Sequence, residues 1–192
     1  MLLLLEASKQ IDVCDGRGRT ALHYAAYSNS PEIVQLLIDH KYTICLQDEE
    51  GLAPAHYATI SSAPHALKQL LQAKADPNLA STQKKFTPLH IAADQGDIAC
   101  LHVLLTYGRT DIGARDYQKR TALHLATMSG EPYAVRQLLA TRDIMKSYIW
   151  EEKSWCHLTE GYQRLSKPPF IGCLHLNSRD EQGQTALHLA VE

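Results

Sequence analysis

The apolar residues of this chain gather in short runs with helical spacing. Residues 33–38 read Ile, Val, Gln, Leu, Leu and Ile, which is typical of the buried side of an α-helix. Ahead of such runs stand pairs of small residues, for example Ala25-Ala26 and Ala92-Ala93. The pattern predicts units of two short helices, in which the small residues allow close approach of a neighbour and the leucines fill the core between units. Neither helix is expected to be stable alone, so the units must stack.

A four-residue signature recurs along the chain. It consists of threonine, then alanine or proline, then leucine and histidine, and its copies are Thr20-Ala21-Leu22-His23, Thr87-Pro88-Leu89-His90, Thr121-Ala122-Leu123-His124 and Thr185-Ala186-Leu187-His188. A weaker copy is Ala53-Pro54-Ala55-His56. The copies that begin at residues 20, 53, 87 and 121 keep a period of about 33 residues, which favours a solenoid of repeats.

This signature, followed by a leucine pair and the run Ala75-Asp76-Pro77-Asn78, resembles that of the ankyrin repeat. The resemblance covers Met1 to Asp143 and Asn177 to Glu192. It implies an all-α fold, an ankyrin-repeat solenoid of stacked helix-turn-helix units with projecting hairpin turns. Lys41 and Lys74 stand where the family usually has a helix-ending glycine, so we expect left-handed backbone and softer joints at both lysines.

Alignment on the signature divides the chain into units. The expected units are a partial repeat at 1–15, repeats at 16–48, 49–82 (degenerate), 83–116 and 117–143, an irregular insertion or decayed repeat at 144–180, and a truncated repeat at 181–192. Because the chain begins and ends inside a repeat, we expect it to be a piece of a longer array. Residues 154–158 match the signature only by histidine and leucine, and Pro168-Pro169 falls where a second helix would run, which favours the insertion without excluding the decayed repeat.

The net charge narrows the kinds of partner, and the cysteine content indicates the cellular compartment. The chain has 192 residues with a formal net charge of -2, so no overall field would draw it onto a nucleic acid or a membrane. The apolar start, Leu2 to Leu5, is too short to span a bilayer, and no basic residue precedes it as a signal peptide would require. The five cysteines show no framework spacing and are expected to be reduced thiols. These features predict a monomer in the cytoplasm or the nucleus, although a parent protein could be membrane-associated.

The many histidines do not indicate catalysis. Five of them occupy the same place in each repeat, His23, His56, His90, His124 and His188, and are expected to hydrogen-bond the turn backbone and the neighbouring repeat. The sequence has no phosphate-binding, metalloprotease or nucleophile motif. We therefore predict no enzyme, no cofactor and no metal site. A zinc-binding element at 156–175 is a remaining alternative, with ligands Cys156, His157, Cys173 and His175.

The expected function is protein binding. The resemblance implies a concave groove, formed by hairpin tips and the exposed edge of the first helices, on which a partner protein or peptide binds. The candidate partner-binding residues are Arg19, Tyr24, Tyr27, Leu52, Tyr57, Lys84, Lys85, Phe86, Asp94, Tyr117, Lys119, Arg120 and Met128. Basic tips beside aromatic residues favour an acidic, hydrophobic segment as partner. The alternative is that the chain is a structural spacer between domains. In that case the basic residues at the tips are ordinary solvated turn charges.

One residue is a candidate for modification. Asn78 matches the turn asparagine that intracellular asparaginyl hydroxylases modify in many ankyrin proteins, while Asp12, Cys45 and Gly113 replace it in the neighbouring repeats. The resemblance therefore implies Asn78 as the possible hydroxylation site.

Overall fold

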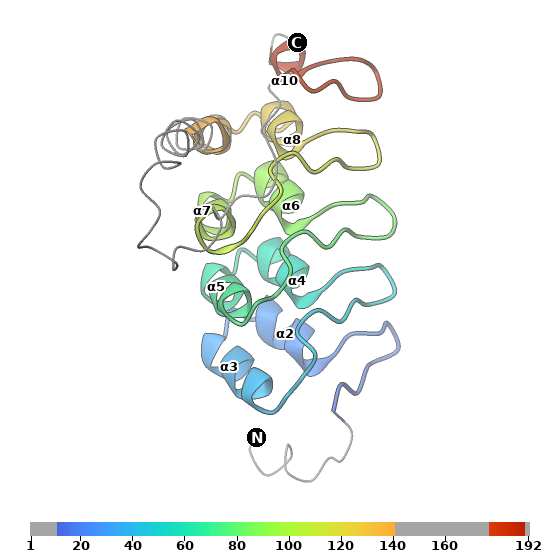
Figure 1. The fold of residues 1–192 in the computed structure, drawn as a ribbon, viewed down its shortest axis with the longest axis vertical. Coiled ribbons are helices and arrows are strands. Elements are labelled where there is room, and N and C mark those ends of the chain that lie inside the picture. The colour runs from blue at the N-terminus through green and yellow to red at the C-terminus, as the bar shows by residue number, and fades with distance from the viewer. Residues whose placement is uncertain (1–10, 141–176, 191–192) are drawn as a thin grey trace, which may run out of the picture.

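The computed structural model describes residues 11–140 and 177–190. In these residues two columns of helices run side by side, with hairpins projecting from one edge (Figure 1). The first column contains α2 (Ala21–Tyr27), α4 (Pro54–Ile60), α6 (Pro88–Asp94), α8 (Ala122–Met128) and α10 (Ala186–Leu189). The second contains α3 (Pro31–Asp39), α5 (Pro64–Gln72) and α7 (Ile98–Tyr107), and residues 132–140 are also helical. The predicted all-α stack of helix-turn-helix units is confirmed.

The histidine of the signature closes the start of each first helix. In α2 the Nδ1 atom of His23 accepts a hydrogen bond from the backbone N–H of Thr20 at 3.0 Å, and the Thr20 hydroxyl lies 3.0 Å from the same atom. This is the arrangement of a capping box, in which the third helical residue reaches back to satisfy the N-cap N–H. Because Nδ1 accepts, the ring is neutral and carries its proton on Nε2.

The opposite ring nitrogen joins each repeat to the next. Each Nε2 donates to the carbonyl oxygen that ends the following hairpin, and the pairs are His23 with Leu52 at 3.1 Å, His56 with Phe86 at 3.1 Å, His90 with Arg120 at 3.2 Å and His124 with Gln184 at 3.3 Å. The prediction that the signature histidines bond both the turn backbone and the neighbouring repeat is confirmed for these four. Among the described residues His188 is bonded within its own repeat, to Thr185. Burial lowers the pKa of His23, His56 and His90, which keeps these rings neutral.

The core lies between the two columns. Its largest fully buried apolar side chains are Leu22, Leu37, Leu67, Leu70, Leu89, Leu101, Leu104, Ile112 and Leu138. Small residues of the first helices, such as Ala92 and Ala93, are also completely buried, so consecutive first helices pack closely, as the sequence pattern predicts. No helix among the described residues is long and apolar enough to cross a membrane.

Each hairpin is organised by the polar residue at its first position. The hairpins are 15–19, 48–52, 81–86, 116–120 and 180–184, as defined by the backbone bond between their end residues. In hairpin 48–52 the carboxylate of Asp48 accepts the N–H groups of Glu50 and Leu52. Backbone bonds such as Thr82 N–H to the Glu50 carbonyl oxygen, at 2.9 Å, tie each hairpin to the next. The hairpin tips therefore form one continuous surface.

Several non-glycine residues adopt left-handed backbone conformations. Lys41 (φ 66°) and Lys74 (φ 70°) end the second helices in this region, as predicted from their alignment with the family glycine. At the hairpin tips the same conformation is taken by Gly18, Gly51 and Gly183, but by lysine in two hairpins, at Lys85 (φ 53°) and Lys119 (φ 61°). A side chain with a Cβ atom costs roughly 1 kcal/mol in this region relative to glycine.

The last described unit stacks directly on the fourth. The N–H of Glu181 donates to the carbonyl oxygen of Gln118 at 2.9 Å, and α10 packs on α8 (Figure 1). Hairpin 180–184 therefore takes the place next to hairpin 116–120, and its first residue, Asp180, lies one position before the boundary drawn from the sequence. Residues 141–176, which include most of the irregular segment and all four zinc candidates, lie outside the described residues.

Candidate functional site

The candidate binding surface is the face formed by the hairpins and the exposed sides of the first helices, which we call the hairpin face. Its side chains come from hairpins 15–19 to 116–120 and from α2, α4, α6 and α8. All thirteen predicted partner-binding residues belong to these elements. They do not play the same part, because some are exposed and others are held by bonds within their own repeat.

A hollow of about 270 Å³ lies between hairpins 48–52 and 81–86. Its apolar lining is Leu52, Ile60, Phe86 and Ile91, and its polar lining is Glu50, Ser81, Gln83, Lys84, Asp94 and Gln95. Four predicted residues, Leu52, Lys84, Phe86 and Asp94, thus meet at one place. Sequence analysis did not single out Ser81 or Gln83, although the loss of the hairpin aspartate at position 81 is a visible signal.

The third hairpin is longer than its neighbours, and this shapes the hollow. The N–H of Phe86 bonds the Ser81 hydroxyl five residues back, whereas Leu52 bonds Asp48 four residues back. The Phe86 ring stacks on His90 with centroids 5.8 Å apart, and the Lys84 ammonium lies 5.5 Å from the Phe86 centroid. A half-buried aromatic ring with a cation above it is typical of an anchor point in protein interfaces.

Hydrogen bonds between first helices hold the other side of the hollow. The side-chain amide of Gln95 donates to the carbonyl oxygen of Ile60 at 3.2 Å. The Ser129 hydroxyl donates to the carboxylate of Asp94 at 2.8 Å. These bonds link α4 to α6 and α6 to the end of α8. They therefore hold in place the helix ends that line this side of the hollow.

Three exposed cations of the hairpin face lie at the third and fourth tips, and a further one, Arg17, lies at the first. Lys84, Lys85 and Lys119 are exposed, and none of them has an ion pair among the described residues. Tyr117, 70% exposed, lies beside them because its N–H donates to the carbonyl oxygen of Lys84 at 3.0 Å. The structure therefore brings together three predicted lysines and one predicted tyrosine.

The two predicted arginines are engaged inside their own hairpins. Arg19 pairs with Asp15 at 2.7 Å and lies 4.9 Å from the Tyr24 centroid. Arg120 pairs with Asp116, whose side chain is 1% exposed, at 2.8 Å. The Arg19 side-chain hydrogen bond lowers the pKa of Asp15. Both guanidinium groups are therefore held in ion pairs within their own hairpins. The sequence pattern did not predict these pairs.

Two of the predicted tyrosines also form hydrogen bonds within their own repeats. The hydroxyls of Tyr24 and Tyr57 each donate at 2.7 Å to the hairpin aspartate of their own repeat. Burial, followed by the hydrogen bond to Asp48, raises the pKa of Tyr57 to about 12. Tyr27 and Met128, 54% and 52% exposed, lie at the far ends of α2 and α8, so they extend the hairpin face along the first helices.

Asn78 lies away from the hairpin face, between the second and third repeats. Its side-chain nitrogen donates to the carbonyl oxygen of Arg109 at 2.8 Å, and its side-chain oxygen accepts the N–H of Asp111 at 2.7 Å. The amide therefore joins two repeats in this conformation. Hydroxylation at Asn78 stays a prediction.

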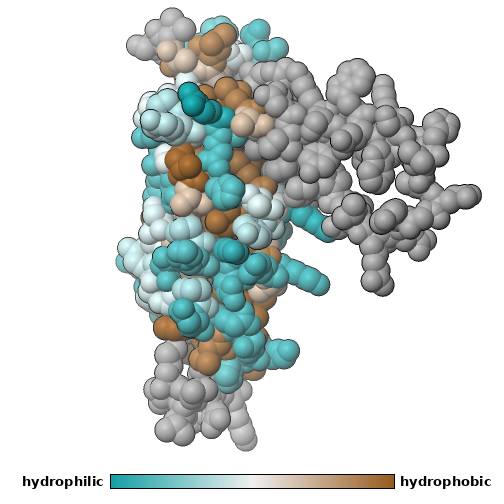
Figure 2. All heavy atoms as spheres, turned by 90° about the vertical axis from the view of Figure 1, so that its left-hand side faces the viewer, coloured by the Kyte–Doolittle hydropathy of each residue, from teal (hydrophilic) through white to brown (hydrophobic). Residues whose placement is uncertain are grey.

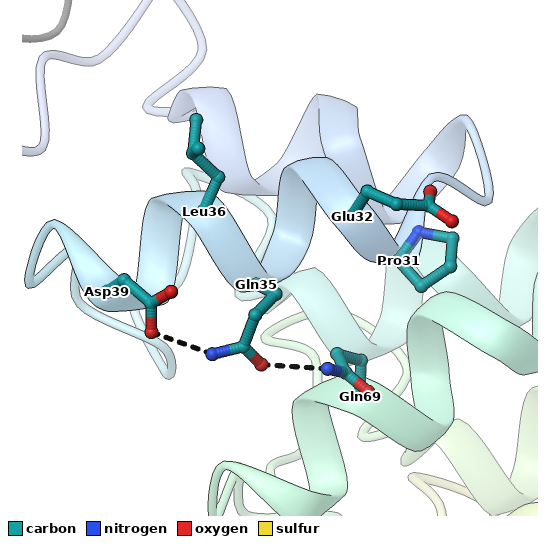
Figure 3. Close-up of a pocket in the computed structure, with 6 residues that line it drawn as sticks. All are labelled: Pro31, Glu32, Gln35, Leu36, Asp39 and Gln69. Carbon is teal, nitrogen blue, oxygen red and sulfur yellow. Dashed lines mark hydrogen bonds between the residues drawn. The ribbon is translucent and has the colours of Figure 1, made fainter. Parts of the chain in front are cut away.

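The outer face is formed by the second helices. Figure 2 shows this side, where hydrophilic and hydrophobic side chains of the described residues are mixed. A shallow hollow there is lined by Pro31, Glu32, Gln35, Leu36, Asp39 and Gln69. Gln35 lies between Gln69 and Asp39 and bonds both at 2.7 Å (Figure 3). These polar groups satisfy one another, and no predicted site residue is among them.

The described residues offer little for covalent or metal chemistry. No group of three or more histidine, cysteine, aspartate or glutamate side chains is placed to hold a metal ion within 11–140 and 177–190. Cys100 is completely buried, and burial raises the pKa of its thiol, which disfavours the reactive thiolate. Four of the repeated histidines, His23, His56, His90 and His124, are buried and hydrogen-bonded to backbone groups.

Comparison with known proteins identifies the family. A family model of ankyrin repeats (three copies) matches residues 1–81 and 63–147, and the chain belongs to the ankyrin-repeat family. Ankyrin repeats are generally protein–protein interaction modules, in which the stacked repeats together form a concave binding surface.

Its relatives are much longer proteins. Inversin from Homo sapiens is 37% identical over 121 residues, which cover 60% of this chain and 11% of inversin. Rabankyrin-5 from Homo sapiens is 30% identical over 138 residues, covering 71% and 12%. A transient receptor potential cation channel subfamily A member 1 homolog from Caenorhabditis elegans is 28% identical over 184 residues, covering 95% and 15%. The chain spans between 11% and 15% of these relatives' own length.

Proposed function

We propose that this chain is a protein-interaction scaffold that binds a partner protein or peptide through its hairpin face. The observation that carries the proposal is the hollow between hairpins 48–52 and 81–86, where apolar side chains from two repeats meet beneath exposed charges. A hollow of this kind accepts an apolar anchor, while the charged rim sets orientation. The other faces of the described repeats carry no comparable combination of predicted residues.

The lysines at the third and fourth tips support this proposal. Lys85 and Lys119 occupy a left-handed position that glycine takes in the other hairpins. A lysine there destabilises the tip by roughly 1 kcal/mol relative to glycine. Functional sites commonly retain such local strain. A binding role for the two ammonium groups explains why lysine stands there.

The partner is an acidic, hydrophobic protein segment under this proposal, and neither a nucleic acid nor a membrane is its direct target. The exposed lysines favour carboxylates, and Phe86 with Tyr117 offers apolar contact. The overall charge of -2 gives no general attraction to a phosphate backbone. We further propose that the scaffold acts as a monomer in the cytoplasm or the nucleus.

Charge reversal with a matched control tests the proposal. Lys85→Glu and Lys119→Glu place a carboxylate at the tips, while Lys41→Glu makes the same change at an exposed, left-handed lysine far from the tips. Arg120 is left unchanged because its replacement would break the pair with Asp116. Immobilised chains are used to capture proteins from a cell lysate, and the captured proteins are compared by mass spectrometry.

The expected result is a partner captured by the wild type and by Lys41→Glu but lost from both tip variants. A structural spacer predicts that no captured protein distinguishes the tip variants from the control. That outcome would reject the hairpin face as a binding site.

A further inference from the structure

Charge changes sign from one hairpin tip to the next beside the hollow. Hairpin 48–52 carries Glu49 and Glu50, and hairpin 81–86 carries Lys84 and Lys85, all exposed. The ion pairs among the described residues are Arg19 with Asp15 and Arg120 with Asp116, so these four charges are not neutralised by pairing. The backbone bond from Thr82 to Glu50 holds the two tips side by side.

The hollow between these tips is lined by one charge from each tip, Glu50 from hairpin 48–52 and Lys84 from hairpin 81–86. Asp94 also lines it, from the end of α6 in the same repeat as Lys84. Lys119 adds a further unpaired cation on the fourth tip. A ligand that crosses from tip 48–52 to tip 81–86 therefore meets the carboxylates of Glu49 and Glu50 first and the ammonium groups of Lys84 and Lys85 afterwards.

We infer that the bound segment is bipolar: it places a basic residue beside Glu49 and Glu50, an apolar side chain in the hollow, and an acidic residue beside Lys84 and Lys85. The inference rests on the proposed function and refines its acidic, hydrophobic segment by adding a basic residue and the order of the charges. A uniformly acidic segment would bring like charges against Glu49 and Glu50, which disfavours that register.

The spacing of the repeats sets the spacing of the charges in the ligand. Packed helices lie about 8–10 Å apart, and an extended chain advances about 3.3 Å per residue. One repeat therefore corresponds to roughly three residues of an extended ligand. The basic and acidic residues lie about three positions apart, with the apolar residue between them.

A random-peptide phage library is the probe for this inference. Selection is carried out on the wild type, on Glu50→Lys and on Lys85→Glu. The control is Glu32→Lys, which makes the same charge change at an exposed glutamate of α3 on the outer face (Figure 3). Peptides enriched on the wild type are sequenced and their affinities are measured as synthetic peptides.

The expected wild-type peptides carry a basic, an apolar and an acidic residue in this spacing. Glu50→Lys weakens them roughly fivefold to tenfold, replacement of the peptide's basic residue by an acid restores binding, and Glu32→Lys has no effect. Peptides that need Lys85 but show no basic residue opposite Glu50 overturn the inference and leave the proposed function standing. No enrichment, or enrichment insensitive to both tip variants, overturns both.

Discussion

Replacement of His90 by alanine should remove the hydrogen bond that its ring makes to the next repeat. The His90 ring is completely buried and lies 2.9 Å from the Thr87 hydroxyl and 3.2 Å from the carbonyl oxygen of Arg120. It also accepts the Thr87 backbone N–H at 3.3 Å and stacks on Phe86. The substitution therefore leaves the buried N–H of Thr87 without a partner and opens a cavity. It also removes one of the two hydrogen bonds to the Arg120 carbonyl oxygen, which still accepts the N–H of Asp116.

The expected loss follows from these contacts. The buried N–H left without a partner costs about 1–3 kcal/mol and the lost hydrogen bond to the Arg120 carbonyl oxygen about 0.5–1.5 kcal/mol, while the cavity adds about 1–2 kcal/mol. His90→Ala should therefore lower the free energy of unfolding by about 2.5–6.5 kcal/mol, a large fraction of the usual 5–15 kcal/mol.

The matched control is the same substitution at His188. His188 is exposed, and within the described part of the chain its hydrogen bonds are those to Thr185 of its own repeat. We expect His188→Ala to cost less than about 1 kcal/mol. Urea unfolding followed by far-UV circular dichroism measures both variants. Equal losses at the two positions would show that the bond to the next repeat does not stabilise the stack.

Three further predictions concern pH, glycine and the hairpin lysines. Burial lowers the pKa of three histidines: His23, His56 and His90. As pH falls, these histidines therefore bind protons in the unfolded chain at a higher pH than in the folded chain. The free energy of unfolding is then highest above pH 6.5 and decreases below it, by up to about 1.4 kcal/mol per pH unit for each ring. A free energy of unfolding that stays constant from pH 7.5 to pH 5 would contradict this. Gly51→Ala should destabilise the chain by about 1–3 kcal/mol more than Gly183→Ala. A Cβ atom at Gly51 would lie 2.6 Å from the Thr82 nitrogen, whereas one at Gly183 would meet no atom within 4 Å. Similar melting temperatures of the two variants would refute this difference. Lys85→Gly should raise stability by up to about 1 kcal/mol while abolishing partner capture, and retention of the partner would remove Lys85 from the binding site.

The sequence alone determined the repeat architecture because its signals are local. The capping histidine lies three residues after its N-cap, and the apolar runs mark helices through spacing along the same segment. A solenoid then adds only contacts between neighbours in the chain. For the same reason Lys41 and Lys74 could be assigned left-handed backbone from alignment with a glycine position.

Tertiary structure decided which predicted residues are available to a partner. Arg120 and Lys119 are adjacent in sequence, yet one is paired with Asp116 and the other is unpaired among the described residues. The hollow exists only because Leu52 and Ile60 of one repeat meet Phe86 and Ile91 of the next. Stacking likewise places hairpin 180–184 on hairpin 116–120, although many residues separate them along the chain. Local patterns encode neither charge pairing nor side-chain contacts between repeats, because both depend on the distances that close packing creates.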